Sequence, residues 1–460
     1  MKQVLRFFAL AALGCISTAA LAGEKYHINT HPIPDNTVLR GVRVIDGTGA
    51  APMEDMAIVI HKKKIVAVGP NAQIGTPRHA EELNWNGKTV IPGLIDGHAH
   101  LGLVLHDKAE GSADAYTEAN VVGELYLYQR YGITTVNSLG LNPDLVYDLR
   151  KRQRQGLIGG SRLLTAGRGI AIEGGAPPLT VKDDAIYRVK NPVEAREAVR
   201  AMAKQKVDII KVWVDSLRGS RPSMNPAIYK AVIDEAHQHQ LPVAAHVYYL
   251  ADAKDLVASG VDILAHSVRD AGVDQELIDA MKSKGTWYIP TLAADESTFT
   301  YLDHPEFLNG SFVRLAAGPG LSARLADTVY EGKIAADRGT AIKRQDLAIA
   351  MQNLRRVAEA GVNIGFGTDA GAQPVRIPGV SEHRELQLMV QAGLTPMQAI
   401  TIATSKSAAM LHQTDTGVIA VGKTADLLVL DGDPLTQIEN TEKILGVWHN
   451  GQRVGELATQ

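Results

Sequence analysis

The spacing of apolar residues divides the chain into two β-rich ends and a different middle. Short runs of alternating apolar and polar residues, separated by turn residues, predict small antiparallel strands at 38–45, 57–60 and 64–69. The same alternation returns near the C-terminus, at 425–432 and 444–451. The two ends together therefore predict one small sheet domain, built from residues 23–88 and 417–460.

The middle of the chain, residues 89–416, repeats another unit. A helical pattern ends at a glycine, a few residues follow, and a short apolar run comes next. Glycine suits the left-handed residue that ends a helix, and short apolar runs suit strands buried on both faces. The pattern predicts an α/β fold with a (β/α)8 TIM-like barrel, with a doubly wound sheet as the alternative. The eight runs are 89–91, 133–136, 162–165, 208–212, 241–245, 261–264, 286–289 and 362–364. Residues 292–350 exceed a normal connection and predict extra helices near the mouth of the barrel.

The first 22 residues have the pattern of a secretory signal peptide. Lys2 and Arg6 precede an apolar run, and residues 20–22 give a small-x-small cleavage site. A lipoprotein signal is the disfavoured alternative, because Ala12 stands where a large aliphatic residue is needed three places before Cys15. No later segment reaches the roughly 18 apolar residues of a spanning helix. We therefore expect a periplasmic or secreted protein, without membrane insertion once the signal is removed.

Composition narrows the possible chemistry. An apolar content of 45% excludes a disordered chain, and a net charge of -3 argues against nucleic acid as the main partner. Cys15 is the only cysteine and lies within the predicted signal peptide. The mature protein would then have no disulfide, no thiolate ligand and no cysteine nucleophile. Any bound metal must be held by histidines, carboxylates or a less usual group.

Histidines stand where the predicted barrel strands end. His98 and His100 follow the first strand two positions apart, so their side chains point to the same side. Two imidazoles at the C-terminal end of a barrel strand can chelate one divalent ion. His246 and His266 end two later strands, and Asp369 follows the eighth. A single His in such a place is more often structural. Four His and one Asp in one barrel are hard to explain by packing, because burying so many titratable groups without a metal is costly.

Lys211 lies inside an apolar run where a buried strand would have another apolar residue. An ammonium group facing four imidazoles and two cations would be repelled and desolvated. Carboxylation of the neutral amine by CO2 would turn it into an anionic carbamate able to bridge two metal ions. The alternative is a lysine at a strand edge that reaches solvent.

Four motifs give the chain a resemblance to the amidohydrolase superfamily over nearly all its mature length. They are residues 41–49 (GVRVIDGTG), 90–100 (VIPGLIDGHAH), 367–371 (GTDAG) and 422–431 (GKTADLLVLD). Within the superfamily the chain looks closest to the imidazolonepropionase-like and prolidase-like (Xaa-Pro dipeptidase-like) metal-dependent hydrolases. The resemblance implies a metal-bearing barrel with a small composite β-sandwich domain.

The resemblance also implies a role for each candidate residue. It implies that a more buried ion is held by His98, His100 and Asp369, and a more exposed ion by His246 and His266. Carboxylated Lys211 would bridge the two ions. Zinc is the usual metal, and manganese, cobalt and nickel fit the same ligand set. Two ions would lower the pKa of a bridging water and polarise the scissile carbonyl. Asp369 would take the proton of the nucleophile and pass it to the leaving nitrogen.

One position departs from the prolidase-like pattern. Many of those relatives have a His after the third strand in a Gly-Gly-His-Gly pattern, and Ala176 stands in its place. Either another donor replaces this His or the substrate differs from a dipeptide. Tyr248 is a candidate oxyanion donor, and Tyr249 and Arg168 are candidate substrate contacts. The alternative for each of the three is wall packing or a structural ion pair.

The leading hypothesis is a hydrolase of an amide bond in a small molecule such as a dipeptide, an N-acyl amino acid or a related xenobiotic amide. A second hypothesis keeps the site and changes the bond to a lactone, carbamate or phosphoester, since the same hydroxide attacks any of them. A third is a non-catalytic scaffold, against which the presence of all six ligand positions argues. Relatives often form symmetric assemblies, so a homo-oligomer stays open.

Overall fold

The two ends of the chain meet in one eight-stranded sheet, as the alternating runs predict. The computed structural model describes residues 36–455, so the predicted signal peptide at 1–22 lies outside the described residues. The sheet runs β20-β19-β18-β5-β1-β2-β3, with β4 paired in parallel to β1. Its strands are β1 (Asn36–Val44), β2 (Met53–His61), β3 (Lys64–Pro70), β4 (Glu81–Asn84), β5 (Thr89–Pro92), β18 (Leu427–Leu430), β19 (Ile444–His449) and β20 (Gln452–Arg453). Trp85 and Trp448 pack edge to face across its core, with ring centroids 6.2 Å apart.

One predicted barrel strand belongs to this sheet instead. The run at 89–91 forms β5, which pairs with β1 on one side and with β18 on the other. The first barrel strand is β6, which begins one residue after β5 ends, beyond Gly93. Both runs are short and apolar, and periodicity alone cannot assign such runs to one sheet or the other.

The middle of the chain forms the predicted barrel of parallel strands. These are β6 (Leu94–Ala99), β9 (Ile133–Ser138), β10 (Arg162–Thr165), β13 (Ile210–Trp213), β14 (Val243–His246), β15 (Ile263–Ala265), β16 (Trp287–Ile289) and β17 (Asn363–Ile364). The amide of Asp208, just before β13, donates to the carbonyl of Thr165, the last residue of β10, at 2.9 Å. This hydrogen bond joins the sheet that contains β10 to the sheet that contains β13. The amide of Gly97 bonds to the Phe366 carbonyl at 2.9 Å, and a bridge between Ala99 and Ala370 closes the ring.

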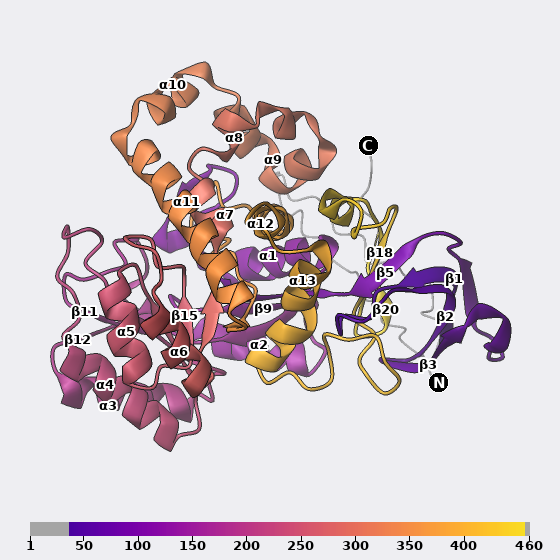
Figure 1. The fold of residues 1–460 in the computed structure, drawn as a ribbon, viewed down its shortest axis with the longest axis horizontal. Coiled ribbons are helices and arrows are strands. Elements are labelled where there is room, and N and C mark those ends of the chain that lie inside the picture. Colours follow the sequence, from indigo (N-terminus) through magenta and orange to yellow (C-terminus); the bar gives the residue numbers. More distant parts are fainter. Residues whose placement is uncertain (1–35, 456–460) are drawn as a thin grey trace, which may run out of the picture. The chain divides into compact units, whose positions relative to one another are not determined.

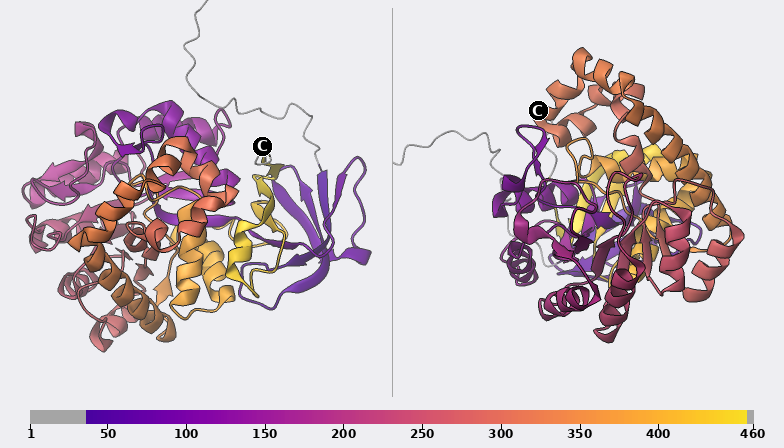
Figure 2. Two further views of the ribbon diagram at one scale, coloured as in Figure 1. Left: turned by 90° about the horizontal axis from the view of Figure 1, so that it is seen from above. Right: turned by 90° about the vertical axis from the view of Figure 1, so that its left-hand side faces the viewer.

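Short strands and helices complete the barrel. β11 (Ile170–Ile172) and β12 (Tyr187–Val189) extend the sheet beside β13, and β7 (Val104–Leu105) pairs with β8 (Glu110–Gly111). The surrounding helices lie outside the strands (Figures 1 and 2) and are α1 (Glu118–Arg130), α2 (Leu145–Arg154), α3 (Pro192–Lys204), α4 (Pro226–Gln238), α5 (Leu250–Ala258), α6 (Gln275–Lys284), α12 (Val380–Gln391), α13 (Pro396–Thr401) and α14 (Ser407–Met410). Gly285, with φ of 70°, ends α6 in the left-handed conformation that the glycine pattern predicts. No helix in residues 36–455 is long and apolar enough to cross a membrane.

The long connection after β16 is helical, as its length and composition predict. It contains α7 (Leu292–Glu296), α8 (Thr300–Asp303), α9 (Ser311–Leu325), α10 (Thr328–Ala336) and α11 (Arg338–Glu359). Helices α8, α9 and α10 form a group at the top of Figure 1, and α11 leads back to the barrel. We call this segment, from Leu292 to Glu359, the helical insertion.

Candidate metal centre

The pair His98 and His100 lies where β6 ends, and both rings face the same carboxylate. Their ring centroids are 5.7 Å apart, and the two Nε2 atoms lie 3.4 and 3.0 Å from Asp369 Oδ1. Gly367 lets the segment that leads to Asp369 pass close to β6, because a Cβ atom on residue 367 would lie only 2.6 Å from His98 Cβ. The side-by-side placement expected from the two-residue spacing is therefore present.

Asp369 is held in place by its backbone and by a guanidinium group. Its φ is 60°, a left-handed conformation that is rare for residues other than glycine and that clusters at functional sites. Its amide donates to the His98 carbonyl at 2.7 Å. Burial alone would raise the pKa of Asp369, but Arg376 and then the two imidazoles hold it well below its ordinary value. Arg376 contacts the second carboxylate oxygen, so the side chain stays anionic.

Lys211 lies on β13 and points into the same cluster. The side chain is fully buried, and Nζ lies 3.5 Å from His98 Nε2. Burial lowers the pKa of the amine to about 7, although Asp369 and Asp215 oppose the shift. A sizeable fraction of the amine is therefore neutral near neutral pH, and only the neutral amine reacts with CO2. The alternative of a solvent-reaching lysine is wrong, because the side chain has no exposed surface.

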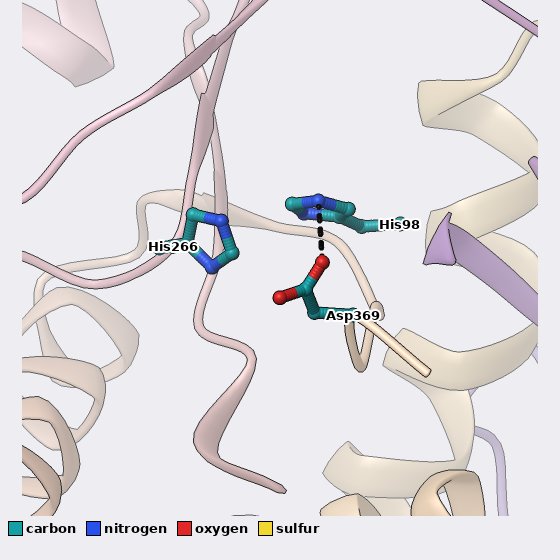
Figure 3. A group of neighbouring side chains, drawn as sticks. All are labelled: His98, His266 and Asp369. Atoms are coloured by element: carbon teal, nitrogen blue, oxygen red, sulfur yellow. Dashed lines mark ion pairs between the residues drawn. The ribbon is translucent and has the colours of Figure 1, made fainter. Parts of the chain in front are cut away.

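His246 and His266 end adjacent strands β14 and β15, and their rings lie 4.3 Å apart. The ring of His266 is also 4.6 Å from that of His98, which joins the two pairs into one cluster. Figure 3 shows His98, His266 and Asp369 facing one another across a common space. The structure thus brings together all six positions predicted as metal ligands.

Two further residues orient these imidazoles, and the sequence analysis missed both. Asp215 Oδ2 lies 2.7 Å from His246 Nε2, and the Thr291 hydroxyl lies 2.7 Å from His266 Nδ1. Each contact engages one ring nitrogen and leaves the other free to bind an ion. Asp215 follows Lys211 by four residues but lies two residues beyond the end of β13, so the two-residue period of a strand does not fix its direction. Thr291 and Arg376 likewise have no pattern in the sequence that fixes their direction.

The donor set fits a divalent cation. His98, His266 and Asp369 offer ligand atoms that lie within 4.8 Å of one another. The Nδ1 atoms of His98 and His100 are buried without a hydrogen-bond partner among residues 36–455. Burial is the main cause that lowers the pKa of His98 and of His266 well below the ordinary value, and nearby positive groups lower it further. Both rings are therefore neutral, which is the form that binds metal.

A pair of buried carboxyl groups lies behind the cluster. The Thr368 hydroxyl is 2.5 Å from Asp96 Oδ2 and 2.9 Å from Glu382 Oε1, and the His98 amide donates to Asp96 Oδ1 at 2.7 Å. Burial and then the neighbouring Glu382 raise the pKa of Asp96 well above its ordinary value. These contacts fix the backbone on both sides of the candidate ligands, since Thr368 precedes Asp369 and Asp96 precedes His98 by two residues.

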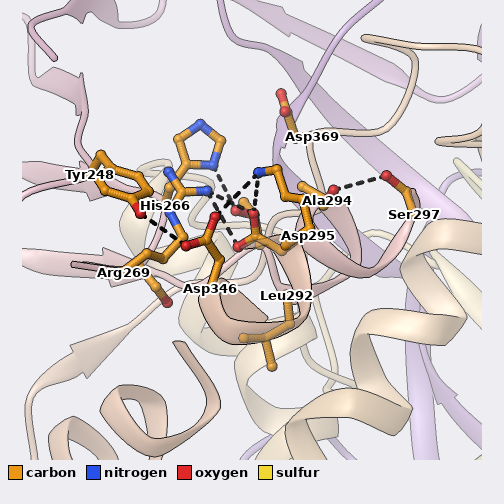
Figure 4. Close-up of polar contacts among 12 residues, drawn as sticks. Tyr248, His266, Arg269, Leu292, Ala294, Asp295, Ser297, Asp346 and Asp369 are labelled. Carbon is orange, nitrogen blue, oxygen red and sulfur yellow. Dashed lines mark hydrogen bonds and ion pairs between the residues drawn. The ribbon is translucent and has the colours of Figure 1, made fainter. Parts of the chain in front are cut away.

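Tyr248 lies beside the cluster in a network that reaches the helical insertion (Figure 4). Its hydroxyl donates to Asp346 Oδ1 on α11 at 2.9 Å, and the guanidinium groups of Arg218 and Arg269 lie 4.7 and 5.1 Å from its ring centroid. Arg269 in turn donates to Asp295 of α7 at 3.0 Å. Tyr248 is therefore held by the insertion, and its role as an oxyanion donor stays a prediction.

The other two predicted substrate contacts have structural partners. Tyr249 shares a hydrogen bond of 3.3 Å with Ser216. Arg168 pairs with Asp144 at 2.9 Å and lies over the Tyr187 ring, 5.0 Å from its centroid. Ala176 is buried and supplies no donor side chain. Contact of Tyr249 or Arg168 with a substrate stays a prediction.

Comparison with known proteins identifies similar chains over most of this length. The model described as "Amidohydrolase family" matches residues 89–454. An imidazolonepropionase of Micrococcus luteus is 25% identical over 427 residues, which cover 87% of this chain and 94% of that protein. The solved structure of a Xaa-Pro dipeptidase with bound methionine in the active site has a TM-score of 0.70 and 26% identity, covering 91% of this chain and 99% of that chain.

A further similar protein has no described activity. An uncharacterized protein of Mycobacterium bovis is 27% identical over 299 residues. The match covers 63% of this chain and 66% of that protein, just under two thirds of its length. The family match and the dipeptidase structure together confirm the predicted fold, a (β/α)8 barrel with a β-sandwich domain.

Proposed function

This chain belongs to the amidohydrolase family, in which the sequence motifs already placed it, and we propose that it is a metal-dependent hydrolase of a carbon–nitrogen bond. The observation that carries the proposal is the convergence of four imidazoles, one carboxylate and one buried amine at the carboxyl ends of the barrel strands. Its finer form is a binuclear enzyme that cleaves an amide bond in a dipeptide, an N-acyl amino acid or a related xenobiotic amide. Similarity to a Xaa-Pro dipeptidase supports a peptide-like substrate.

Six side chains would hold two divalent ions, most simply zinc. They are His98, His100, Lys211 as its carbamate, His246, His266 and Asp369. Such ions, when bound, polarise a carbonyl group and activate a water molecule for attack. The low pKa of Lys211, about 7, supports carboxylation, because the amine loses its proton without a strong base.

The remaining steps belong to the chain's own side chains. Asp369 would accept a proton on Oδ1 and pass it to the leaving nitrogen, while Arg376 holds Oδ2 and keeps the carboxylate oriented. Tyr248 would donate its hydroxyl hydrogen to the oxyanion, in place of the His that Ala176 replaces, and to do so the hydroxyl would have to turn away from Asp346, to which it donates before substrate binds. Tyr249 and Arg168 would contact the rest of the substrate.

The test is a panel of dipeptides and N-acyl amino acids offered to zinc-loaded protein, with lactones and phosphotriesters as the competing class. We expect turnover of at least one amide, its loss on chelation and its return with zinc. Turnover confined to lactones or phosphotriesters would favour the alternative hydrolase. A well-folded preparation that retains no divalent ion would favour the non-catalytic scaffold.

Asp369→Asn provides a sharper test of the proposed chemistry. The amide keeps the size of the side chain and cannot accept the proton, so we expect a fall in kcat of about 10²- to 10⁴-fold with an unchanged far-UV circular dichroism spectrum. Asp279→Asn, on the exposed face of α6, is the matched control. Near-normal turnover would remove Asp369 from proton transfer.

We also propose that the enzyme acts outside the cytoplasm, because residues 1–22 have the composition of a secretory signal. Expression of the full chain followed by N-terminal analysis of the extracytoplasmic fraction would test this. A mature protein that begins near residue 23 is expected, and an uncleaved cytoplasmic chain would contradict it. The same preparation would give the oligomeric state by light scattering.

A further inference from the structure

A cavity of about 220 Å³ lies outside the barrel, between the helical insertion and α12. Tyr301, Phe307 and Phe312 of the insertion line one side. The other side is lined by α12, through Ser381 and Arg384, and by Glu442 of the β-sandwich domain. None of the six candidate metal ligands lines this cavity. We call it the side cavity.

Two hydroxyl groups that line the side cavity have no hydrogen-bond partner in the part of the chain that the structure describes. Tyr301 is 6% exposed and Ser381 is 8% exposed, and both line the cavity. Neither side-chain oxygen has a hydrogen-bond partner among residues 36–455. Neither oxygen belongs to the fully buried side-chain atoms without a partner, so both are open to the cavity, where they can accept a hydrogen bond from water or from a polar ligand.

The charge of the lining favours a cation. The carboxylate of Glu442 accepts a hydrogen bond from Gln387 at 2.6 Å, and it has no ion-pair partner among the described residues. The nearby guanidinium of Arg384 is already neutralised, because it donates to both carboxylate oxygens of Glu296 at 2.7 and 2.6 Å. Burial raises the pKa of Glu442, and the hydrogen bond from Gln387 and the Arg384 guanidinium oppose this shift only in part, so the carboxylate is short of neighbouring positive charge. A bound cation would supply that charge.

The aromatic lining fits the same ligand. The rings of Tyr301, Phe307 and Phe312 give the cavity an apolar wall, and the face of an aromatic ring attracts cations. Phe307 already has the Arg384 guanidinium 5.4 Å from its centroid. A ligand with an aromatic body and a positive end would therefore satisfy both the wall and the unpaired carboxylate.

We propose that the side cavity is a second binding site, separate from the metal centre, for an arylalkyl amine in its ammonium form. The ammonium donates to Glu442 and to the unpaired hydroxyl oxygens, and the aromatic body packs against Phe307 and Phe312. This site does not depend on the proposed hydrolase activity. The two sites are neighbours, however: Ser297 lines the cavity, its Oγ lies 3.4 Å from Arg376 Nε, and Arg376 contacts Asp369.

The test is calorimetric titration of the full chain with 2-phenylethylamine, in the presence and absence of bound zinc. Removing the metal is essential, because a free amine can also bind a metal ion. The neutral 2-phenylethanol and the anionic 3-phenylpropionate are matched probes of the same shape. We expect the amine to bind metal-free and zinc-loaded protein alike, about tenfold more tightly than the alcohol, and the anion not to bind.

Four variants locate the binding. Glu442→Gln removes the charge and keeps the shape, so we expect about a tenfold loss of amine affinity with little change for the alcohol. Glu439→Gln, exposed on the same short helix, is the matched control and should change the amine affinity far less than Glu442→Gln, because water screens its charge from Glu442. Val313→Trp fills the cavity and should abolish both. Tyr301→Phe gives a milder second variant that keeps the ring and weakens amine binding.

Several results would overturn the proposal. Equal affinity for amine and alcohol would remove the charge argument, and so would identical behaviour of Glu442→Gln and Glu439→Gln. Binding that disappears with the metal would place the amine at the metal centre instead.

Discussion

Lys211 shows how burial alters the chemistry of a single side chain. An exposed lysine has a pKa near 10.5, whereas the Lys211 amine has a pKa of about 7 among neutral imidazoles. We predict that Lys211→Ala loses most of the bound metal and of the activity, because the proposed bridging carbamate could not form. Short carboxylic acids such as formate should partly restore both. Elemental analysis after dialysis measures the metal, with the exposed Lys204→Ala as control. Unchanged metal content would contradict the bridging role.

Asp215 determines which nitrogen of His246 is available to a metal. The carboxylate only accepts hydrogen bonds, so its contact of 2.7 Å requires the hydrogen on Nε2 and leaves the lone pair on Nδ1. An asparagine can present its NH2 group instead and select the other tautomer. We predict that Asp215→Asn weakens metal affinity about 10- to 100-fold. Competition with a coloured chelator measures it, and an affinity equal to that of the unchanged protein would contradict this role.

At this scale the sequence predicts the ligands better than the residues that orient them. His98 and His100 stand out because two imidazoles lie two positions apart at a strand end. Asp215 lies two residues beyond the end of β13, where the strand period no longer applies. Arg376 lies seven residues beyond Asp369 in an irregular loop, where no periodicity relates sequence to direction. Its contact with Asp369 depends on the path of that loop through space.

At the scale of elements, short apolar runs predict where strands occur but not always which sheet they join. Most barrel strands follow the predicted runs, because each is buried on both faces and its ends are marked by turn residues. The run at 89–91 is the exception, since only Gly93 separates β5 from β6. The helices of the insertion follow from its length, whereas their contacts with Tyr248 and Arg269 depend on charged pairs that no pattern announces.

Asp346 of helix α11 links the helical insertion to Tyr248 of the barrel. Asp346 accepts the hydrogen bond of Tyr248 at 2.9 Å and also pairs with Arg218. We propose that Asp346 holds the Tyr248 ring in place before substrate binds and gives up the hydroxyl hydrogen to the oxyanion, so that the two residues act as one unit. We predict that Tyr248→Phe and Asp346→Asn each lower kcat/KM about tenfold, and that the double variant loses no more than the worse single variant.

The measurement is a double-mutant cycle on the best amide of the substrate panel. Arg218 contacts both Asp346 and the Tyr248 ring, so the exposed Asp279→Asn on α6 is the control that should leave kcat/KM unchanged. Additive losses would show that Tyr248 and Asp346 act separately. If the single variants change the free energy of unfolding and leave kcat/KM unchanged, Tyr248 and Asp346 contribute to packing and not to catalysis.

At the scale of the whole molecule, the barrel and the β-sandwich domain are joined by more than the chain connection. The main apolar cluster contains barrel residues together with Leu428 and Val447 of the β-sandwich domain. Arg162 of β10 pairs with Asp426 at 3.3 Å across the same boundary. The sequence predicts that both domains exist, because the β-sandwich domain has alternating apolar and polar runs and the barrel has repeated helix–glycine–strand units. The sequence does not predict this boundary, since the boundary consists of single contacts between distant segments.

His383 provides a measurable link across that boundary. Its Nε2 donates to the Tyr131 carbonyl at 2.9 Å, and its Nδ1 lies 3.0 Å from the Thr441 hydroxyl of the β-sandwich domain. The neutral ring satisfies both contacts when the single hydrogen of the Thr441 hydroxyl points to Nδ1 instead of to the Ile438 carbonyl, which lies 2.9 Å from the same oxygen. Burial lowers the pKa of His383 from 6.5 to about 4. Between these two values the unfolded chain therefore binds more protons than the folded chain.

The free energy of unfolding should consequently fall as the pH falls from about 6.5 to about 4, and this single group contributes a loss of about 3 kcal/mol at most. We predict that His383→Gln, whose amide can make both hydrogen bonds without titrating, flattens the pH dependence in that window. Urea unfolding of chelator-treated protein at several pH values measures the effect, because bound metal would add its own pH dependence. His61→Gln, on the exposed end of β2, should keep the slope of the unchanged protein. Equal slopes in all three proteins would mean that another buried group sets the acid limit of stability.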